Sequence, residues 1–252
     1  MSIIFKEDTH QYFNTENNRE YLSGTKFLHL FEPTFDKYGI SKRVAEKEGK
    51  TQQEVLDEWA ATSKAACDLG TATHLIMENY IKFGEKEDEH KILYDTFHEC
   101  VGKDFKYAEA VHSEMLLWNH EYEIAGTADL IIDHKNNEFS IGDFKTNKKI
   151  EFCSAFGNRM LQPVAHLSQC QHNIYALQLS LYAYMYSLLS GRKLRHIFLM
   201  HCNDRSKGWK YIPCNAMEHE IRFMLHFYKE HIKNKKLIYK YGSFLSNITN
   251  TI

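Results

Sequence analysis

Apolar and polar residues alternate most clearly in the middle of the chain, between residues 126 and 146. This segment, GTADLIIDHKNNEFSIGDFKT, predicts two β-strands joined by a tight turn. The first predicted strand carries Asp129, and the second carries Asp143, followed two residues later by Lys145. Because strand side chains alternate between the two faces of a sheet, Asp143 and Lys145 point in the same direction.

The length of this turn decides whether the two aspartates meet. Directly opposite residues of an antiparallel pair share a face, so Asp129 faces Asp143 only if the hairpin is centred on Asn136. That register requires an odd loop, most simply residues 135–137, with Asn137 in the left-handed region that asparagine tolerates. A two-residue turn would place the two carboxylates on opposite faces. We predict the three-residue loop or a compensating bulge.

Apolar residues spaced three or four apart predict helices before this hairpin. Thr51 begins a capping-box pattern at the start of one helix, and Gly70 is predicted to interrupt that helix. Residues 71–83 then predict a helix whose apolar stripe lies opposite His74 and Glu78. The predicted stripe consists of Leu69, Ala72, Ile76, Tyr80 and Phe83.

The most apolar helix is predicted at residues 172–190, after the hairpin. It is apolar on nearly all sides, which is typical of a buried helix, yet Tyr175, Gln178 and Tyr182 line up on one face. A buried glutamine amide needs hydrogen-bonding partners, and either the core or a binding site can supply them.

The rest of the pattern completes a mixed order of strands and helices. Such an order predicts an α/β domain with a central mixed sheet flanked by helices and an N-terminal helical extension. We expect a single domain over residues 1–252, with an N-terminal hairpin and helical region (1–69), a core (70–215) and a C-terminal helix and tail (216–252). Further strands are predicted at residues 2–5, 10–22, 107–118, 194–202 and 208–213.

Composition is ordinary for a globular protein, with 43% hydrophobic and 25% charged residues. The net charge of −2 gives no global signal for nucleic acid, so such binding would need a local patch. Lys148, Lys149 and Arg159 lie in a segment that is either such a patch or a solvated loop. No apolar run is long enough to span a membrane and no signal-peptide pattern opens the chain, so we expect a cytoplasmic protein with no membrane partner.

Two carboxylates and an ammonium group on one sheet face are costly unless a cation or an anionic substrate binds there. We therefore interpret Asp129, Asp143 and Lys145 as part of a metal site that cuts phosphodiesters. His74 is either an ordinary surface or core histidine or an imidazole ligand beside the aspartates. Glu114, on the preceding strand, is either a solvated edge acid or a third acid of the cluster.

Several separated motifs together resemble the PD-(D/E)xK nuclease superfamily, and within it the RecB-like exonuclease branch. That branch shows Gly-x-x-x-His, an acid followed by Gly-x-x-Asp, then Asp-x-Lys and Gln-x-x-x-Tyr. Each motif is weak alone, but all of them occur in this order. The N-terminal YLSGTKFLHLF is also similar to the Ser-x-Thr segment of phage nucleases and of the mitochondrial genome maintenance exonuclease. The matching residues are Gly70–His74, Glu114, Gly126–Asp129, Asp143–Lys145 and Gln178–Tyr182.

This resemblance implies a restriction-endonuclease-like core and a set of metal ligands. His74, Asp129 and Asp143, helped by the backbone carbonyl of Phe144, would bind a divalent cation. Mg²⁺ or Mn²⁺ suits such an oxygen-rich set, and the imidazole slightly favours Mn²⁺.

The resemblance also implies catalytic roles. Lys145 would orient or deprotonate the attacking water and offset charge on the phosphate. Glu114 would act as an accessory acid, and Glu78 as a weaker one. Gln178 and Tyr182 would steady the attacking water or the substrate phosphate.

The implied activity is that of a metal-dependent DNA exonuclease acting on single strands or DNA ends. Its setting would be phage or bacterial replication, recombination or repair, with proteins of those processes as partners. An endonuclease of the same chemistry (restriction or flap type) and an inactive nucleic-acid-binding scaffold are the alternatives. Some members of the branch hold an iron–sulfur cluster through clustered cysteines. Cys202 and Cys214 are too few and too far apart for this, so we expect no cluster.

Overall fold

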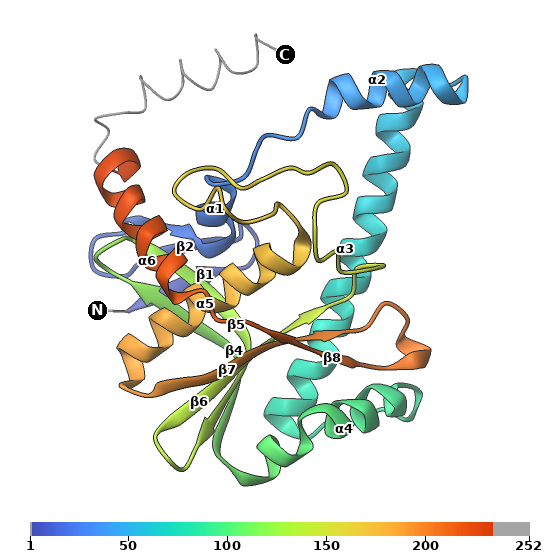
Figure 1. Ribbon diagram of the computed structural model, residues 1–252. Coiled ribbons are helices and arrows are strands. Elements are labelled where there is room, and N and C mark those ends of the chain that lie inside the picture. The colour runs from blue at the N-terminus through green and yellow to red at the C-terminus, as the bar shows by residue number, and fades with distance from the viewer. Residues whose placement is uncertain (1, 234–252) are drawn as a thin grey trace.

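The computed structural model describes residues 2–233, which form an eight-stranded mixed sheet with helices on both faces (Figure 1). The strand order is β1-β2-β3-β5-β6-β7-β8, and β4 pairs with β5 off this path. The pairs β3–β5 and β6–β7 are parallel, and the other pairs are antiparallel. The predicted α/β class, a central mixed sheet flanked by helices, is confirmed. The strands are β1 (Ile3–Lys6), β2 (Gln11–Asn14), β3 (Glu20–Ser23), β4 (Ala108–Asn119), β5 (Ile124–His134), β6 (Glu138–Lys145), β7 (Lys193–His201) and β8 (Lys210–Cys214).

Local sequence signals fix where several helices begin. Ser23 caps α1 by accepting a hydrogen bond from the Lys26 N–H, and Thr51 and Glu54 form the predicted capping box of α3. The helices are α1 (Gly24–His29), α2 (Lys37–Glu48), α3 (Gln52–Phe83), α4 (Lys91–Tyr107), α5 (Gln171–Ser190) and α6 (Glu218–Phe227), with shorter 3₁₀ turns at Asp88–His90 and Arg205–Lys207 and a π turn at Tyr228–Lys233.

Helix α3 differs from its prediction in two respects. It runs for 32 residues without a break, so the predicted interruption at Gly70 is wrong. One glycine costs a helix about 1 kcal/mol, which a helix of this length tolerates. The predicted apolar stripe is right only in part: Tyr80 is buried, but Leu69, Ala72 and Phe83 are exposed, and Thr73 and Met77 are buried in their place. Only the later part of α3 packs on the sheet, while its beginning projects outward with α2 (Figure 1).

The central hairpin has the predicted register. Leu130 pairs with Gly142 and His134 with Glu138, which leaves a three-residue loop centred on Asn136. Asn137, the last loop residue, has a φ of 61° in the left-handed region, as predicted. This register aligns Asp129 with Asp143 at the end of the ladder.

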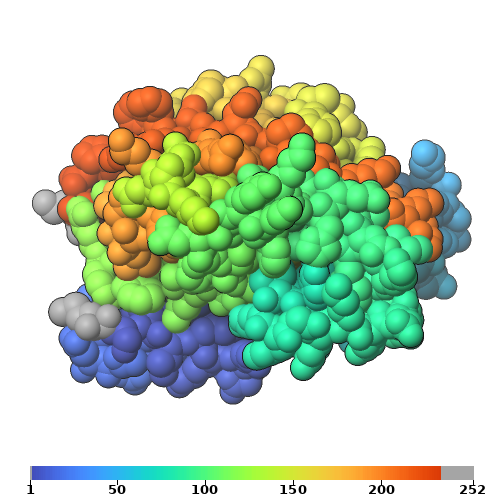
Figure 2. Space-filling model, turned by 90° about the horizontal axis from the view of Figure 1, so that it is seen from below, coloured from blue at the N-terminus to red at the C-terminus, as the bar shows by residue number. Residues whose placement is uncertain are grey.

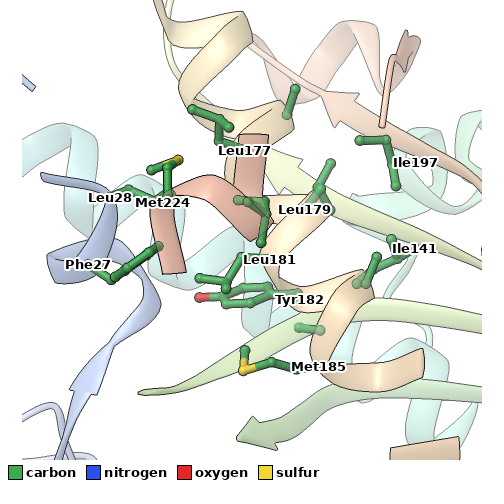
Figure 3. Packing of buried hydrophobic residues seen from close by; sticks show 14 of the residues in the cluster. Phe27, Leu28, Ile141, Leu177, Leu179, Leu181, Tyr182, Met185, Ile197 and Met224 are labelled. Atoms are coloured by element: carbon green, nitrogen blue, oxygen red, sulfur yellow. The ribbon is translucent and has the colours of Figure 1, made fainter. Parts of the chain in front are cut away.

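Two hydrophobic cores cover the two faces of the sheet. One holds α1, α5 and α6 against β6 and β7, with Phe27 and Leu28 meeting Tyr182 and Met224 (Figure 3). The other holds α3 and α4 against the opposite face. Burial of this apolar surface is the main source of folding free energy. A third, smaller cluster packs β1–β3 against β4 and β5, and Figure 2 shows this N-terminal segment in blue along one edge of the molecule.

Among residues 2–233, no helix has both the length and the apolar character that a membrane span requires. Most of the predicted C-terminal tail follows Lys233 and lies outside the described residues.

Candidate metal centre

The sheet has a gap on one side of β5. β3 pairs with β5 only at Ile124 and Ala125, whereas β6 pairs with it from Leu130 onward. β4 pairs along the other side of β5. Residues 126–129 therefore have no strand partner toward β3 and β6 in the described part of the chain. The gap ends at Asp129, and the candidate site lies there.

Glu114 and Asp129 stand opposite each other across β4 and β5. The ladder keeps one register before and after this position, although these two residues form no ladder pair themselves. Glu114 has a φ of 51°, which is uncommon for any residue other than glycine. Backbone strain of this kind persists where surrounding structure enforces it, and it is frequent at functional sites. The strained residue is the one that brings a second carboxylate beside Asp129.

His74 reaches the same place from α3. Its Nε2 lies 2.9 Å from the carbonyl oxygen of Phe144, and its Nδ1 lies 3.5 Å from Asp129 Oδ2 and 3.9 Å from Glu114 Oε1. When Nε2–H donates to the carbonyl, Nδ1 is directed at the two carboxylates, which is how metal-binding histidines are commonly oriented. His74, Glu114 and Asp129 each offer a ligand atom, and these atoms lie within 4.8 Å of one another.

Asp143 and Lys145 form a buried ion pair next to this group. The Lys145 ammonium also lies 4.6 Å from the ring centroid of Tyr175, a favourable cation–π distance. Burial lowers the pKa of Lys145, but the negative charges of Asp143 and Asp129 outweigh it and raise the pKa above its usual value. Lys145 is therefore held as an ammonium group.

Tyr182 and Gln178 close the gap from α5. They share a hydrogen bond, and burial raises the pKa of the Tyr182 phenol, so it stays neutral. A Cβ atom added at Gly24 or Gly126 would lie 2.7 Å or 2.6 Å from ring atoms of Tyr182. Glycine is needed at both positions because the ring approaches the backbone so closely.

The electrostatics of the group favour a bound cation. Burial and the nearby charge of Asp143 raise the pKa of Asp129 to about 7. Burial lowers the pKa of His74, but Asp129, Glu114 and Asp143 outweigh it and raise the pKa to about 9. Carboxylates that crowd together in a buried site bind protons more tightly than usual, and a divalent cation replaces those protons effectively. Two carboxylates and an imidazole therefore fit a divalent metal ion.

The structure gathers the predicted ligands in a different grouping from the expected one. Glu114, expected as an accessory acid, belongs to the three-residue group, whereas Asp143, expected as a ligand, faces Lys145. The Phe144 carbonyl accepts a hydrogen bond from His74, and its N–H donates to Asp129. The ligand roles themselves stay predictions.

Other residues singled out in the sequence lie in local contacts. Glu78 pairs with Lys82 at 2.6 Å. Lys149 pairs with Glu151, and Arg159 donates to the His166 carbonyl, so both help to order the segment between β6 and α5.

The sequence did not reveal the pocket in which the group lies. This pocket has a volume of about 560 Å³ and extends from Asp129 to the N-terminal strands. Its far wall comes from residues to which the sequence assigned no role at the site, so only their position in space identifies them: Phe5, Thr9, His10, Lys26 and His29.

Glu114→Gly is expected to give a more stable protein than Glu114→Ala, by about 1 kcal/mol. Glycine adopts a positive φ without the steric penalty that alanine keeps. Urea denaturation of both variants in the presence of EDTA measures the difference. Equal stabilities would contradict the assignment of backbone strain to this position.

Neither a family model nor a curated protein matches this chain. Among solved structures, the protein SSO0001 is similar at 14% identity and a TM-score of 0.34, over 85% of this chain and 76% of that one. A candidate exonuclease from Eubacterium rectale is similar at 11% identity and a TM-score of 0.39, over 92% of this chain and 85% of that one. Similarities at these TM-scores establish neither the fold nor the function of this chain.

Proposed function

We propose that this chain is a metal-dependent nuclease that hydrolyses phosphodiester bonds in DNA. The observation that carries the proposal is the group of His74, Glu114 and Asp129 in a sheet gap, beside the ion pair of Asp143 and Lys145. His74, Glu114 and Asp129 offer ligands for a cation, and Lys145 offers a fixed ammonium group for an anionic substrate. The order of motifs in the sequence supports the same conclusion.

His74, Glu114 and Asp129 would hold Mg²⁺ or Mn²⁺, with Asp143 available at the edge of the group. When bound, such a cation polarises a phosphoryl oxygen and lowers the pKa of a coordinated water molecule. The backbone of Phe144 orients two of the ligands, because its N–H donates to Asp129 and its carbonyl accepts from His74. Geometry held in this way before substrate binds reduces the reorganisation that the reaction requires.

Lys145 would stabilise negative charge on the phosphate rather than remove a proton from water. Its raised pKa favours the ammonium form, which can only donate hydrogen bonds. Tyr175 and Asp143 fix the direction of this group. Tyr182 and Gln178, on α5, also line the pocket, where a neutral phenol and an amide can position the substrate phosphate or the attacking water.

A DNA strand that enters by its end suits the site best. The pocket is lined from eight elements, β1, β2, β3, α1, α3, β4, β5 and α5, together with residues of the β1–β2 turn. Walls contributed by so many elements favour an end over an uninterrupted strand. We therefore propose exonuclease activity, within replication, recombination or repair, and in concert with proteins of those processes.

Hydrolysis of end-labelled linear and of circular single-stranded DNA, with Mg²⁺ or Mn²⁺, tests this function. We expect the wild type to degrade linear DNA only, and Asp143→Asn to lose about 10²-fold or more of the rate. Degradation of circles would indicate an endonuclease instead. If the wild type and Asp143→Asn show the same rate of DNA hydrolysis and neither rate depends on the metal, the proposal is overturned and a binding scaffold is favoured.

A further inference from the structure

The pocket continues beyond the candidate metal group. From His74, Glu114 and Asp129 it extends to the turn between β1 and β2 and to the start of α1. Its volume of about 560 Å³ lies within the range of small-molecule binding sites, about 300–1,000 Å³. A sphere of that volume is about 10 Å across, and a whole duplex is wider than its major groove, which alone measures about 12 Å. The space therefore suits part of a single strand better than a duplex.

The far wall is fixed relative to the metal group. Ser23, at the end of β3, pairs with Ala125 on the strand that carries Asp129. The Tyr12 hydroxyl lies 3.2 Å from the Thr127 hydroxyl, which ties β2 to the same strand. The backbone pairing of β3 with β5 and the contact between Tyr12 and Thr127 therefore fix the far wall to the strand that carries Asp129.

An aromatic surface lies on this far wall. The Phe5 ring stacks on Tyr12 at 4.8 Å and meets the edge of the His10 ring at 5.0 Å. His10 is exposed and has a φ of 54°, so its ring is presented at a strained turn. Aromatic faces bind unpaired bases with little sequence preference, because every base has a π-face.

A cationic side chain, Lys26, also lines the pocket. Lys26 is exposed, and its side chain makes no ion pair with any of residues 2–233. Its backbone is held in place, because its N–H donates to Ser23 in the cap of α1. A phosphate is repelled by the carboxylates, and the ammonium group of Lys26 in the same pocket supplies a compensating attraction.

We propose that this pocket binds one unpaired nucleotide next to the scissile bond. The base lies against Phe5 and His10, and the flanking phosphate contacts Lys26. This assignment rests on the proposed nuclease function and adds to it the residues that would hold the unpaired nucleotide.

Fluorescence anisotropy with a labelled dT₁₂ oligonucleotide tests the pocket without hydrolysis, in Ca²⁺ to neutralise the acids. We expect Lys26→Ala to weaken binding about tenfold, and Lys26→Arg to retain wild-type affinity within about twofold. We expect His10→Ala to weaken binding about tenfold as well. Lys103→Ala, an exposed lysine on α4 that does not line the pocket, is the matched control and should bind like the wild type.

An abasic site separates base binding from a structural effect of His10→Ala. Removing the base from the terminal nucleotide that enters the pocket should weaken binding to the wild type more than binding to His10→Ala, which keeps only Phe5 against the base. Wild-type affinity in both Lys26→Ala and His10→Ala would overturn the pocket assignment, even if the enzyme cleaves DNA. If no metal-dependent cleavage is observed, the proposed nuclease function is overturned. The anisotropy measurements would still show whether the pocket binds an unpaired nucleotide.

Discussion

Lys145→Met is expected to lower the rate of DNA hydrolysis by about 10²- to 10³-fold, the usual effect of removing one group that stabilises transition-state charge. Methionine keeps most of the volume of the lysine and removes its charge. The ammonium group is held by Asp143 and by the ring of Tyr175, 4.6 Å away, so its charge has a fixed position beside the acids. Initial rates on single-stranded DNA under saturating Mn²⁺ measure the loss.

Lys145→Arg distinguishes the two roles that a lysine can have at this site. A guanidinium keeps the positive charge but cannot act as a base. If Lys145 acts through its charge, the arginine variant should retain more activity than Lys145→Met, by about tenfold. An arginine variant as inactive as Lys145→Met, with an unchanged melting temperature, would contradict the electrostatic role and favour proton removal.

The sequence predicted the central hairpin well because its signals are local. Asn137 tolerates a positive φ, and the alternating pattern around it leaves few possible registers. The same holds for the capping box at Thr51 and for the long apolar helix that becomes α5. Sequence periodicity was less reliable for α3, because the sheet covers only its later part and exposed apolar residues obscured the buried stripe.

The arrangement of the site could not be read from the sequence, because it depends on contacts between distant segments. The gap beside β5 arises where β3 and β6 diverge, and no local pattern encodes that divergence. The unusual φ of Glu114 is likewise imposed by the strands around it, since glutamate has no preference for that region. The motifs predicted which residues would gather, whereas the fold determines that Glu114 lies closest to His74 and Asp129.

The metal-free protein is expected to lose stability as the pH rises from about 6 to about 9. The pKa of the Asp129 carboxyl is raised to about 7 in the folded protein, from a value near 4 in the unfolded chain. The stability that comes from tighter proton binding in the folded state is therefore lost as the pH rises from about 4 through 7. The pKa of His74 is raised to about 9, so its contribution is complete below about 6.5 and lost as the pH rises through 9. Both groups therefore act in the same direction. A melting temperature lower by about 4 °C at pH 9 than at pH 6, in EDTA, is expected.

Mn²⁺ should reverse this loss, because a ligand that binds only the folded state raises its stability. The increase in melting temperature should be larger at pH 8 than at pH 6, since protons compete with the cation for Asp129 and His74. Asp129→Asn is the matched control: its amide imitates the protonated carboxyl and can still accept the hydrogen bond from the Phe144 N–H. This variant should show a weaker dependence on pH and a smaller response to Mn²⁺. If the wild type and Asp129→Asn respond alike to both pH and Mn²⁺, the buried carboxylate is not what couples folding to metal binding.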